Sequence, residues 1–189
     1  MIYHIDRYTI NHHMSIKKHK IIGLTTDPYD KIYGYSLVFF RLMDFLQRNY
    51  KELDVTLIAN QGTSSTIVKN PCFKLISIKK DGNIIIKTFV LIFNFIKFVF
   101  YSDKDTVIIA NSELPELIAA LLLKIKFKNV YGIIQDDRVR NNCIYTTLVC
   151  KTRIILLYAI NDVIFTNRYT MSRFNNSINK YYIGNPIFY

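Results

Sequence analysis

Short apolar runs alternate with longer segments of helical periodicity along most of this chain. The runs are rich in Ile, Val and Leu and end in turn residues, which favours strands. The predicted strands are residues 20–26, 54–59, 73–78, 106–110, 129–134, 162–166 and 180–183. The predicted helices are residues 36–49, 84–101, 112–126, 141–160 and 169–175. Continuously apolar strands are buried on both faces, as in parallel sheets covered by helices. The pattern therefore predicts an α/β class fold, a single doubly wound, Rossmann-like domain with a mostly parallel sheet of about seven strands and helices on both faces.

Residues 1–19 do not share this pattern, since they are polar and contain all four histidines of the chain. We therefore predict a polar N-terminal extension, followed by one domain over residues 20–189. The predicted domain has no histidine to serve a Ser–His or Cys–His pair or to ligate a metal, so no metal site is expected.

The three cysteines, Cys72, Cys143 and Cys150, are too few and too scattered for a disulfide framework. The first residues also lack the long apolar run of a secretory signal. We therefore predict a reducing, cytoplasmic location, with peripheral contact to a membrane as an additional expectation.

The segment 84–101 is the most apolar part of the chain and contains Lys87, Asn94 and Lys97. Two lysines within eighteen residues argue against a transmembrane span. On a helix the three polar residues form one narrow stripe. We predict a helix buried against the sheet, with its lysines reaching water; an interfacial membrane helix is the alternative.

The formal net charge is +11, and it is concentrated in two parts of the chain. Residues 69–104 contain seven basic and two acidic residues, and residues 138–189 contain seven basic and one acidic residue. Such a surface suits polyanions, and an anionic membrane surface is the partner that we expect. The alternative is that lysine only keeps the surface soluble. Nucleic acid is not expected, because no recognition motif is present and the aromatic residues fall in apolar runs.

Acidic residues follow three of the predicted strands, at the carboxyl edge where ligands bind in open parallel sheets. They are Asp27, Asp30, Glu113, Glu116, Asp136 and Asp137. For Glu113 and Glu116, ordinary first-turn chemistry of a helix with Ser112 as its N-cap is the favoured explanation. For Asp136 and Asp137 we favour a site, because paired carboxylates after a buried strand can accept a proton or bind hydroxyls.

The first predicted strand leads into a loop with one glycine, Gly34, between Tyr33 and Tyr35. The chain has neither a Gly-x-Gly-x-x-Gly fingerprint nor a Walker-type Gly-Lys-Ser, so no dinucleotide cofactor is expected. Gly34 either lets backbone N–H groups approach a phosphate or permits a tight turn.

The order of these segments resembles the amino-terminal domain of GT-B glycosyltransferases of the retaining class that uses nucleotide sugars. Three passages carry the resemblance: KIIGLTTDPYDKIYGYSLVFFRLMDFLQ, VYGIIQDDR and NDVIFTNRYTMSRF with the later KYYIGNPI. The resemblance extends from about Lys20 to Phe188. It implies that Gly34 lies near the donor phosphates or the acceptor, and that Asp136 or Asp137 lies in the acceptor pocket.

Two departures from that family matter. Its first loop usually has two consecutive glycines, where this chain has Tyr33 and Gly34. The donor-binding domain of that family has two glutamates eight residues apart. In this chain the residues eight positions after Glu52, Glu113 and Glu116 are Asn60, Leu121 and Lys124, so none of these glutamates begins such a pair.

The expected function is therefore transfer of a sugar from a nucleotide-sugar donor to an acceptor, with a separate donor-binding subunit or a homodimer completing the site. The alternative is a non-enzymatic binding module with a glycosyltransferase-like fold that docks on a membrane or protein partner. The predicted catalytic residues are Asp136 and Asp137. The predicted substrate-binding residues are Tyr33, Gly34, Tyr35, Asn111, Glu113, Gln135, Arg138 and Asn185.

Overall fold

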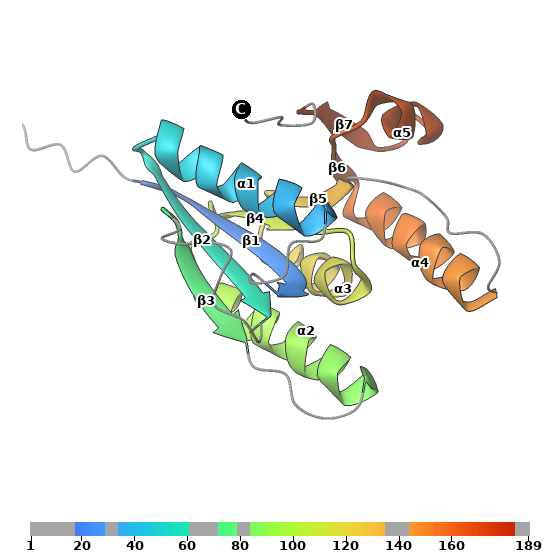
Figure 1. Cartoon of the computed structure of the whole chain (residues 1–189), viewed down its shortest axis with the longest axis horizontal. Helices are drawn as coiled ribbons and strands as arrows, with labels where there is room; N and C mark the ends of the chain where they lie inside the picture. Colours follow the sequence, from blue (N-terminus) through green and yellow to red (C-terminus); the bar gives the residue numbers. More distant parts are fainter. Residues whose placement is uncertain (1–17, 29–33, 61–71, 79–83, 135–143, 184–189) are drawn as a thin grey trace, which may run out of the picture.

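The computed structural model describes residues 18–28, 34–60, 72–78, 84–134 and 144–183, which contain seven strands and five helices (Figure 1). The strands are β1 (His19–Pro28), β2 (Leu53–Asn60), β3 (Lys74–Ile78), β4 (Val107–Ala110), β5 (Val130–Ile134), β6 (Asp162–Phe165) and β7 (Asn179–Tyr182). The helices are α1 (Gly34–Asn49), α2 (Ile84–Phe100), α3 (Leu114–Leu123), α4 (Ile144–Ile160) and α5 (Arg168–Arg173). The predicted α/β class is confirmed, and β1 begins one residue earlier than predicted.

All seven strands join one sheet in the order β3-β2-β1-β4-β5-β6-β7, and every pair is parallel. The chain winds outward from β1 to β3, then crosses back to the other side of β1 and winds outward again from β4 to β7. The direction of winding therefore reverses between β1 and β4. In doubly wound folds the carboxyl end of this pair is where ligands bind.

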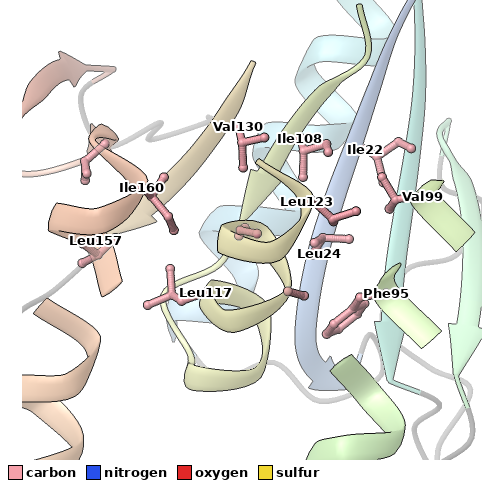
Figure 2. Close-up of a cluster of buried hydrophobic side chains, with 14 of the residues drawn as sticks. Ile22, Leu24, Phe95, Val99, Ile108, Leu117, Leu123, Val130, Leu157 and Ile160 are labelled. Carbon is pink, nitrogen blue, oxygen red and sulfur yellow. The ribbon is translucent and has the colours of Figure 1, made fainter. Parts of the chain in front are cut away.

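Helices cover both faces of the sheet, as predicted. Of the described helices, α1 alone packs on one face, where Phe39, Phe40 and Met43 join a buried cluster with residues of β1 and β2. On the opposite face α2, α3 and α4 lie side by side, α3 contacting both of its neighbours (Figure 1). Phe95 of α2 and Leu117 of α3 belong to the larger cluster on that face (Figure 2).

Gly132 of β5 is a point where this second layer comes very close to the sheet. A Cβ atom at this position would lie 2.6 Å from Cδ2 of Leu157 and 3.5 Å from Cδ2 of Leu117. Leu157 is only 1% exposed and has little free space into which it could move. Glycine therefore allows α3 and α4 to pack directly on the β5 backbone.

We expect Gly132→Ala to lower the free energy of unfolding by about 1–3 kcal/mol, the usual cost of overpacking a core. The smaller entropy of the unfolded alanine chain would offset only about 0.4–1 kcal/mol of this loss. Urea denaturation measures the difference, with Ser77→Ala at an exposed site of β3 as the control. An unchanged midpoint for Gly132→Ala would show that the layer is not tightly packed there.

The start of α3 differs from the prediction, which made Ser112 the N-cap. The N-cap residue is Glu113, and its side chain makes no capping hydrogen bond. The Ser112 hydroxyl instead accepts a hydrogen bond of 2.9 Å from Arg153 of α4. The helix also ends at Leu123 rather than near Lys126, because the N–H groups of Ile125 and Lys126 bond three residues back and tighten the last turn.

The prediction that α2 is buried holds for one side of this helix. Leu91, Phe95 and Val99, spaced by four residues, are buried against the sheet. On the other side Phe89 and Phe93 are 69% and 67% exposed, so apolar side chains face outward as well as inward. Among the residues that the structure describes, no helix has both the length and the apolar character needed to cross a membrane.

Candidate functional site

A cluster of polar side chains lies at the carboxyl ends of β1 and β4, where the winding of the chain reverses. β1 extends beyond β4, since Leu24 pairs with Ala110 and Thr25 and Thr26 follow. The N–H group of Asn111 donates to the carbonyl of Leu24 at 2.9 Å and holds the next loop beside β1. We call these residues the switch-point cluster: Thr25, Thr26, Asn111, Ser112, Glu113, Glu116 and Arg153.

Glu116 is the most unusual member of the switch-point cluster, because it is a fully buried acid in the first turn of α3. Its Oε1 accepts a hydrogen bond from the backbone N–H of Thr26. Among the described residues its Oε2 has no hydrogen-bond partner. Burial raises the pKa of this carboxyl to about 8, although the hydrogen bond from Thr26 opposes the shift. Glu116 is therefore mostly protonated and neutral at pH 7.

Asn111 fixes the geometry between the two strands. It is buried, and its side-chain amide donates to the Thr25 hydroxyl at 3.3 Å. Its Oδ1 accepts from the N–H group of Ser112 at 3.0 Å. These bonds hold the end of β1 and the loop before α3 in one arrangement, so Glu116 is presented at a fixed position.

Arg153 connects α4 to this loop through two contacts. Its guanidinium donates to the Ser112 hydroxyl and lies 3.4 Å from a carboxylate oxygen of Glu113. Both side chains of the ion pair are partly exposed, so the pair contributes little to stability. In this ion pair the negative charge of Glu113 balances the positive charge of Arg153. The cluster therefore offers little net attraction for a phosphate.

Asn60, the last residue of β2, has a second buried oxygen of this kind. Its Oδ1 has no hydrogen-bond partner among the described residues. Asn60 pairs with Pro28 at the carboxyl end of β1. It follows Ile58 by two positions and so belongs to the sheet face that carries α2 and α3. A buried polar atom without a hydrogen bond is costly.

Two of the predicted site residues, Asn111 and Glu113, are brought together in the switch-point cluster. Gly34 and Tyr35 are the first residues of α1, after the carboxyl end of β1. The other predicted residues lie outside the described ones: Tyr33, Gln135, Asp136, Asp137, Arg138 and Asn185. β5 ends at Ile134, two residues beyond the position that pairs with Ala110, so the chain leaves β5 at the same edge of the sheet.

Sequence reasoning did not identify the importance of Glu116, Thr25, Thr26 or Arg153. For Glu116 a signal was present, because it is the only charged residue of the apolar helix LPELIAALLL. Its spacing from Ala119, Ala120 and Leu123 puts it on the buried side of that helix. For Arg153 no signal was present, since only the packing of α4 on α3 brings it to Ser112.

The described residues contain no group of three or more His, Cys, Asp or Glu side chains that could hold a metal ion. The comparisons with known proteins add no family to this description. No protein-family model matches the sequence, and neither does any curated protein. The chemistry of the switch-point cluster is thus the main guide to function.

Proposed function

We propose that this domain binds the acceptor in a sugar-transfer reaction of the GT-B glycosyltransferase type. The observation that carries the proposal is the buried carboxyl of Glu116, which lies at the switch point with one oxygen unpartnered among the described residues. In its protonated form this carboxyl can donate one hydrogen bond and accept others. A hydroxyl group, which also donates and accepts, is the complementary ligand.

The charge of the switch-point cluster supports a neutral ligand over an anionic one. Arg153 is paired with Glu113, and Glu116 would become a buried anion if it lost its proton. A diphosphate would therefore meet no free cation among the residues of this cluster. An uncharged sugar hydroxyl fits better, and this favours the acceptor side of the reaction over the donor side.

In this proposal Asp136 and Asp137 act on the acceptor hydroxyl, one of them accepting its proton as the sugar is transferred. Glu116 and Asn60 hold the acceptor in place, because a neutral carboxyl is a poor base and a good hydrogen-bonding group. A nucleotide sugar is the donor, and a donor-binding subunit or the second copy in a homodimer binds it. The anomeric carbon of the sugar forms a bond to the acceptor oxygen, its bond to the diphosphate breaks, and the nucleoside diphosphate is the leaving group. No cofactor is required.

The test is an NMR titration of the ¹⁵N-labelled protein with hexoses, N-acetylhexosamines and their disaccharides, and separately with UDP-glucose and GDP-mannose. We expect the uncharged sugars to shift the backbone resonances of Thr26, Asn111 and Ser112. Nucleotide sugars alone should leave these resonances in place. Sugars that shift only resonances distant from the switch-point cluster, or no resonances at all, would contradict the proposal.

Two variants at one position sharpen this test. Glu116→Gln keeps a donor and an acceptor and should retain sugar binding. Glu116→Met has similar length and no hydrogen-bonding group, and it should bind about tenfold more weakly, since a hydrogen bond in a buried site contributes about 1–1.5 kcal/mol. Equal binding by both variants would exclude Glu116 from recognition. The wild-type titration remains decisive if Glu116→Met does not fold.

A second candidate function, a non-enzymatic module that docks on a membrane or protein partner, is favoured by the outward apolar side of α2. The two functions are compatible, because the exposed apolar side chains of α2 are not members of the switch-point cluster.

A further inference from the structure

The layer formed by α2, α3 and α4 exposes large apolar side chains on the side that faces away from the sheet. We call this surface the outer helical face and define it by Ile86, Phe89, Phe93 and Phe100 on α2, Leu122 and Ile125 at the end of α3, and Leu148 and Ile155 on α4. Ile125 is 89% exposed, and the two central phenylalanines are each about two-thirds exposed. Monomeric proteins rarely expose so many large apolar side chains on one surface unless that surface binds something.

The spacing along α2 shows that this exposure is systematic. Positions 86, 89, 93 and 100 recur at intervals of three, four and seven, which puts them on one side of a helix. The buried residues Leu91, Phe95 and Val99 occupy the opposite side. One side of α2 thus holds the helix on the sheet, and the other presents a row of apolar side chains to the surroundings.

The charge of the outer helical face is positive. Neither α2 nor α4 contains an acidic residue, and the only acid within α3 is the buried Glu116. Lys97 on α2 and Lys151 on α4 are exposed. Lys126 lies with its Nζ 4.6 Å from the centre of the Phe100 ring, beside the end of α2. The first acidic residues after α2 in the sequence, Asp103 and Asp105, lie in the turn that follows this helix.

The combination of phenylalanine, leucine and isoleucine with lysine distinguishes two kinds of partner. Lysine is depleted in protein–protein interfaces, where a rigid and fully desolvated surface forms. At a lipid surface the apolar side chains enter the acyl region, and lysines reach the anionic head groups with their flexible stems. We propose that the outer helical face docks on an anionic lipid bilayer, with α2 lying parallel to the membrane plane. This inference is independent of the sugar-transfer proposal, because it uses none of the switch-point residues.

The test is co-sedimentation of the full chain with vesicles of phosphatidylcholine alone and with vesicles containing about 30% phosphatidylglycerol. We expect binding to the anionic vesicles and much weaker binding to the neutral ones.

Phe89→Ser combined with Phe93→Ser should weaken the binding by at least about tenfold, since two exposed phenylalanines no longer enter the lipid. Lys97→Gln combined with Lys151→Gln should weaken it by about fivefold for each lysine and reduce the dependence on salt.

The matched control is Tyr50→Ser, which removes an exposed aromatic side chain next to α1, on the opposite face of the sheet. It should bind the vesicles like the wild type. Absence of wild-type binding, equal binding to neutral vesicles or an unaffected phenylalanine double variant would each overturn the proposal. Sedimentation velocity without lipid tests whether a second copy of the chain binds the outer helical face instead. A wild-type dimer that dissociates in the phenylalanine double variant would show this and overturn the lipid proposal.

Discussion

Glu116→Gln should remove a loss of stability that the wild-type protein undergoes between about pH 4.5 and pH 8. The pKa of this carboxyl is 4.5 in an exposed environment and about 8 in the folded protein. Below pH 4.5 it is protonated in both the folded and the unfolded state, so it makes no difference to folding. Between the two pKa values only the unfolded state releases the proton, and rising pH favours unfolding. Above pH 8 the loss is complete and constant.

The expected slope is about 1.4 kcal/mol of unfolding free energy per pH unit within this window. The total over the whole window is several kcal/mol, a large fraction of the stability of a typical domain. Glutamine resembles the protonated carboxyl in shape and can still accept the hydrogen bond from Thr26. The variant should therefore fold, equal the wild type at low pH and exceed it in stability at pH 8.

Urea denaturation at about pH 5, 6.5 and 8 measures this difference between variant and wild type. Taking the difference between variant and wild type cancels the contributions of the groups that the two proteins share. Glu113→Gln is the matched control, because it changes a half-exposed carboxyl three residues away and leaves Glu116 in place. The control should keep the slope of the wild type. Parallel curves for Glu116→Gln and the wild type would show that Glu116 is ionised in the folded protein.

The second large effect is expected from Phe95→Ala in α2. Phe95 has no exposed surface and packs in the core between α2 and the sheet. Truncating such a side chain leaves a cavity that the surroundings fill only in part, and the usual cost is about 3–5 kcal/mol. We expect this loss in the free energy of unfolding, measured by urea denaturation. If the domain has a stability near the lower end of the usual range, about 5 kcal/mol, the variant would be close to unfolding at room temperature.

Phe93→Ala is the control in the same helix. The side chain of Phe93 is 67% exposed, so its removal should change the stability by no more than about 0.5 kcal/mol. The two substitutions delete the same atoms at positions two residues apart. Comparing their losses of stability therefore distinguishes the buried side of α2 from its exposed side. Equal losses from both would mean that the outer side of α2 is covered in solution, by a second copy of the chain for instance.

Much of the fold could be predicted from the pattern of apolar residues, and the reason is physical. A strand in a parallel sheet is buried on both faces, so runs such as Thr106–Ala110 stand out in the sequence. The structure puts β4 at Val107–Ala110, inside that run. The ends of helices were harder to predict, as Ser112 shows, because its hydroxyl could either cap α3 or bond to Arg153. The choice depends on how α4 packs.

The site could be predicted only in its location. The carboxyl edge of the sheet follows from topology alone, and Asn111 and Glu113 were predicted there. The role of Glu116 depends on burial and on the backbone of Thr26, which is ninety residues away in the chain. For α2, sequence reasoning favoured burial against the sheet and kept an interfacial membrane helix as the alternative. Periodicity could not show that one apolar side of this helix is buried and another faces outward.

The pairing of β1 with β4 has a consequence for the order in which the protein folds. The register joins Ile21 to Val107, so a loop of more than eighty residues must close before these strands meet. Closure of so long a loop costs entropy and slows folding, whereas β1, α1 and β2 can assemble from nearby residues. The bond between Thr26 and Glu116 cannot form in any intermediate that lacks the β1–β4 pair. We therefore expect the switch-point cluster to form late in folding, and we expect a fluctuation that separates β1 from β4 to disrupt it.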